Sequence, residues 1–84
     1  MRSPLLELRE RLGLTISEMA AALGLHYASY YNAEVGLGAI PKKARAALEE
    51  LSVDFDNLTD LQARWINERA AERRQVIMAK AGAA

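Results

Sequence analysis

The stretch that decides the fold is TISEMAAALGLHYASYYNAEVG, residues 15–36. It opens with a capping box, because the Thr15 hydroxyl and the Glu18 carboxylate can each accept a hydrogen bond from a free backbone amide at the start of the same helix. An apolar face at helical spacing follows until Gly24 interrupts it, and consists of Ile16, Met19, Ala20 and Leu23. The pattern predicts a short helix from Ile16 and, a few residues later, a second helix over about Tyr27–Val35.

The junction between these two helices, LGLH at residues 23–26, is short. A short turn that contains glycine makes two helices cross steeply and share a core, which is the helix-turn-helix unit. Gly24 suits the turn because glycine adopts a positive φ without strain, and Ala20 is small enough to let the second helix approach. The apolar positions of the shared core are also filled, by Met19, Leu23, Leu25, Tyr30 and Ala33. The sequence therefore predicts a helix-turn-helix.

Helical patterns on both sides of this unit predict three more helices. The first is expected over Pro4–Leu12, since Ser3 and Pro4 make a start signal and Gly13 a stop. Its inward face would hold Leu5, Leu8 and Leu12.

Pro41 restarts helicity after the glycines at 36 and 38, and a fourth helix is expected over Pro41–Leu51. Its inward residues would be Ala44, Ala47, Leu48 and Leu51. A polar turn follows, and Asn57 with Asp60 predicts the capped start of a long last helix over Leu58–Lys80. The loose apolar stripe of that helix consists of Leu58, Leu61, Trp65, Ile66, Ala70, Ile77 and Ala81.

The composition points to one all-α domain. The chain has 84 residues, 51% hydrophobic and 26% charged, which is enough for one modest core. We expect a compact helical core over residues 1–57 and a C-terminal helix, residues 58–84, in the same domain. The chain has no cysteine, which suits a reducing cytoplasm, and no apolar run near the roughly 18 residues of a membrane span. Eleven basic and eleven acidic residues give a formal net charge of zero, so a role with nucleic acids must rest on local pattern.

The chain resembles the Cro and lambda-repressor-like (XRE-type) family of helix-turn-helix domains in LLELR at 5–9, GLTISEMAAALGL at 13–25 and EVG at 34–36. Ile40-Pro41 also resembles a phage-type variant in which proline opens the fourth helix. The resemblance implies a compact five-helix bundle that forms homodimers and lays its third helix in the major groove of double-stranded DNA. It further implies a transcriptional repressor of phage or mobile-element type that reads an inverted repeat, often in its own promoter.

Carried over to this chain, the resemblance divides the site residues into two groups. Base edges would be read by Tyr27, Ala28, Ser29 and Asn32. The DNA backbone would be contacted by Thr15, Ile16, Ser17, His26, Tyr31, Lys42 and Lys43. Asn32 can bind adenine through two hydrogen bonds, and Ala28 can touch a thymine methyl group.

Two features depart from the family. Ile16 stands where the family commonly has a glutamine that contacts DNA, and the expected recognition helix holds no Arg, Lys or Gln. Few cations release few counterions, so we expect a gentle salt dependence per monomer and reliance on a dimer for affinity.

Other interpretations stay open. Trp65 and Ile66 are large apolar residues on a helix that is longer than is needed to cover a four-helix core. They predict either a lid on that core or the dimer contact. The same fold would suit an antitoxin that binds its own promoter. It would also suit a protein-interaction module without DNA readout, which the zero net charge and the cation-free helix favour.

Enzymatic activity, a metal and a cofactor are not expected. His26 is the single histidine, the chain has no cysteine, and the sequence places no carboxylate beside His26. The glycines at 36 and 38 follow a helix and match neither nucleotide-binding signature.

Overall fold

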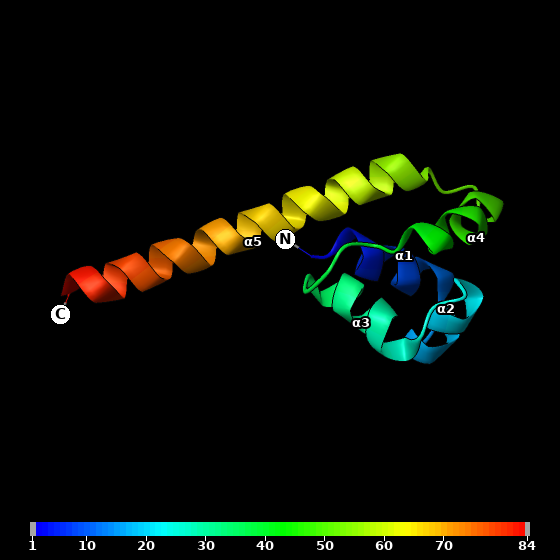
Figure 1. The fold of residues 1–84 in the computed structure, drawn as a ribbon, viewed down its shortest axis with the longest axis horizontal. Helices are drawn as coiled ribbons and strands as arrows, with labels where there is room; N and C mark the ends of the chain where they lie inside the picture. Colours follow the sequence, from blue (N-terminus) through cyan, green and yellow to red (C-terminus); the bar gives the residue numbers. More distant parts are fainter. Residues whose placement is uncertain (1, 84) are drawn as a thin grey trace.

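The computed structural model describes residues 2–83. Within this range the chain forms five α-helices and one 3-10 turn, and no strand (Figure 1). In chain order the elements are α1 (Pro4–Leu12), α2 (Ile16–Ala22), α3 (Tyr27–Val35), η1 (Lys42–Ala44), α4 (Arg45–Glu50) and α5 (Phe55–Ala83). The expected all-α fold with a helix-turn-helix and a longer last helix is confirmed.

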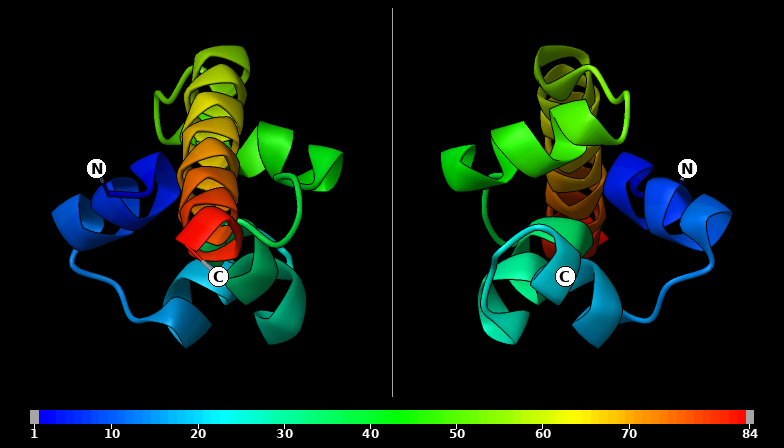
Figure 2. Two further views of the ribbon diagram at one scale, coloured as in Figure 1. Left: turned by 90° about the vertical axis from the view of Figure 1, so that its left-hand side faces the viewer. Right: turned by 90° about the vertical axis from the view of Figure 1, so that its right-hand side faces the viewer.

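The helices α1 to α4 gather around the first half of α5, and the second half of α5 projects away from them (Figure 1). Viewed along α5, α1 lies on one flank, α4 on the other, and α2 with α3 on the far side of the bundle (Figure 2). The projecting helix makes the molecule long, with extents of 51 × 23 × 21 Å. No helix in the described range is both long and apolar enough to cross a bilayer.

One core joins all five helices. Its fully buried members include Leu5 of α1, Met19 of α2, Tyr30 of α3 and Leu48 of α4, each with no exposed surface. The first turns of α5 add Phe55 and Leu58, and Trp65 is only 4% exposed. From Ala70 to Gly82 every residue of α5 is exposed. The core therefore ends near Ile66, and the rest of α5 is outside it.

The predicted start and stop signals of α1 and α2 are confirmed. The Ser3 Oγ accepts a hydrogen bond from the Leu6 amide at 3.3 Å, and Gly13 ends α1 with φ 68°. In the capping box the Glu18 amide donates to Thr15 Oγ1 at 3.1 Å, and the Thr15 amide donates to Glu18 Oε1 at 3.0 Å. The hydrogen bond from the Thr15 backbone amide to the carboxylate is the main cause that lowers the pKa of Glu18, and the Thr15 side chain adds to it.

The boundaries of the last two helices were predicted wrongly. Pro41 has extended backbone, so the chain first makes the turn η1 and α4 covers only Arg45–Glu50, instead of one helix over Pro41–Leu51. The long helix begins at Phe55, because the Asn57 amide donates to Asp54 Oδ1 at 3.1 Å. Asp54 therefore provides the cap that had been assigned to Asn57. The helix also continues past Lys80 to Ala83.

Two leucines expected inside are exposed. Leu12 is 39% exposed because it is the last residue of α1, immediately before the turn at Gly13. Leu51 is 44% exposed at the C-cap of α4. In the stripe of α5, Leu61 is 41% exposed because the neighbouring Gln62 takes the inward position.

Candidate nucleic-acid interface

The turn between α2 and α3 has the hydrogen bonds of a tight helix end. Gly24 has φ 68°, and its amide donates to the Ala21 carbonyl at 3.1 Å. The Leu25 amide donates to the Ala20 carbonyl at 2.9 Å, and the Leu25 side chain enters the core. These bonds bring the chain from α2 into α3 within four residues, and the two helices pack together.

The outward face of α3 carries the residues expected to read bases. Its exposed residues are Tyr27, Ala28, Ser29, Tyr31 and Asn32. Tyr30 and Ala33, one or two positions away, are buried in the core. The structure therefore brings all the expected base-reading residues to one exposed helix.

The two exposed tyrosines of α3 form a pair. The rings of Tyr27 and Tyr31 have centroids 6.3 Å apart and planes only 7° from parallel. Tyr27 is 53% exposed and Tyr31 is 42% exposed. The stacking gives α3 a continuous aromatic ledge one turn long.

The residues expected at the DNA backbone lie partly in the α2–α3 unit and partly outside it. Thr15 and Ser17 are exposed at the start of α2, whereas Ile16 is half-buried and packs against the core. His26 is exposed directly before α3, and its side chain makes no capping hydrogen bond. Lys42 and Lys43 are exposed too, but they lie outside the α2–α3 unit, in η1, which packs with α4.

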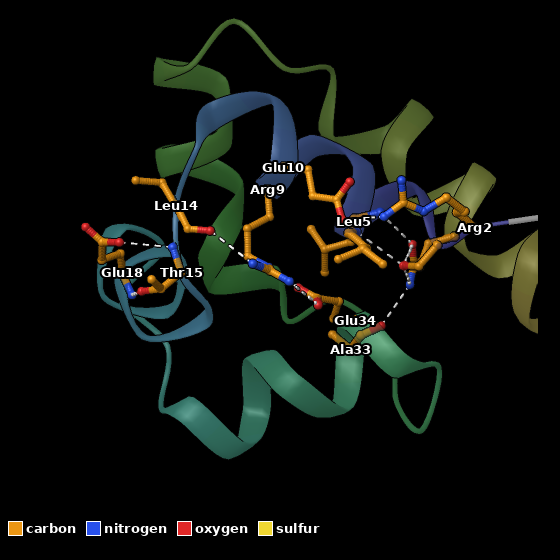
Figure 3. A network of polar contacts seen from close by, with 12 residues as sticks. Arg2, Leu5, Arg9, Glu10, Leu14, Thr15, Glu18, Ala33 and Glu34 are labelled. Atoms are coloured by element: carbon orange, nitrogen blue, oxygen red, sulfur yellow. Dashed lines mark hydrogen bonds and ion pairs between the residues drawn. The ribbon is translucent and has the colours of Figure 1, made fainter.

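The charged residue of α3 faces inward. Glu34 is 5% exposed and forms a bidentate ion pair with Arg9 of α1, with Nε to Oε2 at 2.8 Å and Nη2 to Oε1 at 3.0 Å. The remaining Arg9 nitrogen, Nη1, donates to the Leu14 carbonyl at 3.0 Å (Figure 3). The hydrogen bonds to Glu34 raise the pKa of Arg9. Arg9 thus links α1 to α3 and to the loop that leads into α2.

Tyr30 lies buried next to this ion pair. Its hydroxyl has no hydrogen bond of ordinary geometry, and burial raises the pKa of its phenol far above the usual range. The Glu34 carboxylate adds to this rise, because it disfavours a second negative charge nearby.

A buried glutamine of α5 holds the same end of α3 as the ion pair. Gln62 is 2% exposed, and its Nε2 donates to the Ala33 carbonyl at 2.8 Å and to Ser3 Oγ at 3.1 Å. Its Oε1 accepts from the Leu5 amide at 3.0 Å. One side chain therefore connects α5 to the start of α1 and to the last turn of α3.

Trp65 lies over the same end of α3. A Cβ added to Gly36, where φ is 87°, would be 2.9 Å from Cζ3 of Trp65. The Arg69 guanidinium stacks 4.8 Å from the centre of the Trp65 ring, and its Nη1 donates to the Val35 carbonyl at 3.4 Å. Trp65 therefore serves as a lid on the core, with Ile66 half-buried beside it.

Sequence reasoning missed the residues that fix the orientation of α3. Arg9 and Gln62 carry a detectable signal, because each comes four residues after an inward leucine, Leu5 and Leu58 respectively. A polar side chain at such a position needs a buried partner. The partner itself comes from another helix and cannot be found from spacing.

The described part of the chain has no cluster of three His, Asp or Glu side chains that could hold a metal ion.

A comparison with family models gave one described as Helix-turn-helix, which matches residues 5–55, more than half of the chain. The comparisons with curated proteins and with solved structures gave no match. The matched range runs from the core leucine of α1 to the first residue of α5 and includes the whole α2–α3 unit.

Proposed function

Because this chain belongs to the Cro/C1-type (XRE) helix-turn-helix family of DNA-binding domains, we propose that it is a homodimeric repressor of phage or mobile-element type that binds an inverted repeat in its own promoter. The observation that carries the proposal is the outward face of α3, where Tyr27, Ala28, Ser29 and Asn32 are exposed together. A helix with an exposed polar face, held rigidly from behind by Arg9 and Gln62, is suited to enter the major groove.

In the proposed complex, α3 reads base edges and the start of α2 contacts phosphates. Asn32 supplies the bidentate contact to adenine. The backbone contacts come from Thr15, Ile16, Ser17, His26 and Tyr31, and from the lysines of η1 on the neighbouring phosphates. Lys42 and Lys43 are the cations of this set, so the electrostatic part of the affinity is small per protomer.

Titration of the DNA upstream of the coding sequence with the full chain tests this function. Asn32→Ala should lower affinity for the operator by roughly ten-fold, since one good base contact is worth about 1–3 kcal/mol, and should leave non-specific binding unchanged. The double variant Lys42→Ala/Lys43→Ala should weaken binding to all duplexes and reduce the salt slope by about two. Arg64→Ala is the matched control, because Arg64 is exposed on α5 before the segment proposed for the dimer contact. Absence of binding at low salt would exclude the repressor and leave the protein-interaction module.

We assign the dimer contact to the side of α5 that begins at Ile66 and continues beyond the core. Trp65 itself is covered by its own chain, so it supports this surface from below. Two adjoining hollows mark the surface, one lined by Leu37, Ile66 and Ala70 and one by Arg73, Val76 and Ile77, among others. Leu37, Val76 and Ile77 are 72%, 54% and 67% exposed, which is unusual for large apolar side chains and supports coverage by a second copy.

A promoter-binding antitoxin is the second candidate function. The same exposed apolar side of α5 favours it, because a different protein could cover Val76 and Ile77 in place of a second copy. The two candidates differ in the state of the isolated chain, which is a dimer in the first and a monomer in the second.

A further inference from the structure

We infer that α3 recognises the C5-methyl groups of thymine, and that the base pairs facing it are A·T pairs; this inference rests on the proposed function. It begins with the charge of the outward face of α3. The exposed side chains of this helix are those of Tyr27, Ala28, Ser29, Tyr31 and Asn32, and none of them is charged. The carboxylate of α3, Glu34, is turned into the core.

The face of α3 lacks the arginine or lysine that most often reads guanine. Guanine is most often read by Arg or Lys, which donate two hydrogen bonds to its O6 and N7. The arginines that contact α3 are Arg9 and Arg69. Arg9 already donates through Nε, Nη1 and Nη2 within the protein, and Arg69 donates to the Val35 carbonyl while it stacks on Trp65. The amide of Asn32 has one donor and one acceptor side by side, which matches N7 and N6 of adenine.

The aromatic ledge of Tyr27 and Tyr31 supplies the apolar half of the recognition. Each ring is held nearly parallel to the other at 6.3 Å, so the two rings present a shared surface rather than two independent side chains. The methyl group of Ala28 is exposed next to this ledge. Three of the five outward residues form this apolar surface, which an apolar group on the DNA would match.

Thymine is the base that offers such a partner. Among the four bases, the C5-methyl of thymine is the apolar group displayed in the major groove. Covering one methyl group with apolar surface is worth about a four-fold gain in affinity. The tyrosine hydroxyls lie at the ends of the rings and remain able to reach phosphates or polar base edges.

The first part of the test is selection of duplexes from a random pool by the full chain, followed by replacement of single thymines with uracil. Uracil keeps every hydrogen-bonding group of thymine and removes the methyl alone. Each replacement under α3 should weaken binding about four-fold, and replacements in the flanking sequence should leave the affinity unchanged.

The second part uses matched variants of the ledge. The double variant Tyr27→Phe/Tyr31→Phe retains the rings and should still distinguish thymine from uracil four-fold. The double variant Tyr27→Ala/Tyr31→Ala should lose most of this discrimination and keep only the part that Ala28 supplies. If the alanine variant binds no duplex at all, the phenylalanine variant and the uracil series together decide the outcome.

Two results would overturn the inference while the proposed function stands. One is a selected half-site with G·C pairs under α3, and the other is equal affinity for thymine and uracil duplexes in the unmodified chain. Failure of the chain to select any duplex would refute the proposed function itself, and the inference with it.

Discussion

Arg9 and Glu34 lie 25 positions apart in the sequence and form a two-point ion pair, at 2.8 and 3.0 Å, between α1 and the helix with the exposed tyrosines. Their side chains are only 16% and 6% exposed. At this depth the attraction between the charges has to offset the loss of water around both of them. The pair therefore defines the position of α3 more than it adds to net stability.

Removal of one partner of this pair should be far worse than removal of both. Glu34→Ala leaves the Arg9 guanidinium buried without its counter-charge, and we expect a loss of about 3–5 kcal/mol in the free energy of unfolding. Arg9→Met/Glu34→Leu should be much less destabilised. Urea unfolding followed by circular dichroism measures both, and a double variant as unstable as the single one would contradict this account. Asp56→Asn is the control, because the exposed pair Arg45–Asp56 should contribute less than about 1 kcal/mol.

Gln62 should be the most sensitive polar residue of α5. Gln62→Ala would leave the Leu5 amide and the Ala33 carbonyl without their partner in the core, at a loss of about 2–4 kcal/mol. Gln75→Ala on the exposed half of the same helix should be neutral. Thermal unfolding of the two variants gives the comparison, and equal melting temperatures would refute the role assigned to Gln62.

Three glycine variants separate backbone strain from steric conflict. Gly38→Ala has open space and should cause no loss of stability. Gly24→Ala also has open space but φ 68°, and should lose about 1–2 kcal/mol. Gly36→Ala has φ 87° and in addition meets Trp65 at 2.9 Å, so it should lose about 1–3 kcal/mol more than Gly24→Ala. Urea unfolding with Trp65 fluorescence checks the order, which a Gly36→Ala variant no weaker than Gly24→Ala would disprove.

Deletion of residues 75–84 should separate assembly from folding. Residues 75–82 are exposed, so the shortened chain should keep its melting temperature within a few degrees. It should sediment as a monomer and bind the operator more weakly, and Ile77→Glu should behave in the same way. A shortened chain that remains dimeric would contradict the dimer contact proposed on α5. A full-length chain that sediments as a monomer would contradict the homodimer and favour the antitoxin.

The capping box predicts a pH dependence. The pKa of Glu18 is lowered from 4.5, so the carboxylate stabilises the fold fully above pH 4.5. This stabilisation should be lost as the pH falls below 4.5 and through the lower pKa of the folded state. Glu18→Gln keeps an oxygen acceptor but does not titrate. Melting temperatures of the two proteins should therefore converge on acidification, and a constant difference down to pH 2 would exclude the effect.

Local signals in the sequence were sufficient for the first half of the fold. Ser3, Gly13, Thr15, Glu18 and Gly24 act on backbone groups within a few residues of themselves, and the structure has all of them in the expected role. The boundary of α5 was missed because Asp54 and Asn57 are both good caps, and the burial of Phe55 decided between them.

The site was predictable in its exposed residues and not in its supports. Helical spacing alone places Tyr27, Ala28 and Asn32 outside once Tyr30 and Ala33 are inside. Spacing cannot show that Tyr27 and Tyr31 stack, or that the partner of Gln62 is a carbonyl on another helix. These contacts depend on how the helices pack in space.

The hydrogen bond from Gln62 to the Ala33 carbonyl fixes the position of α3 relative to α5. In the proposed dimer, α5 contacts α5 of the second copy and also holds the end of α3 in its own protomer. Both contacts are made by one continuous helix. Since each residue adds about 1.5 Å of length and 100° of rotation to a helix, the phase of α5 between Ile66 and Ile77 would set the spacing of the two operator halves. Adding or removing one residue there would turn Val76 and Ile77 by about 100° around α5 relative to Ile66, and so would change how the two reading helices are placed relative to each other.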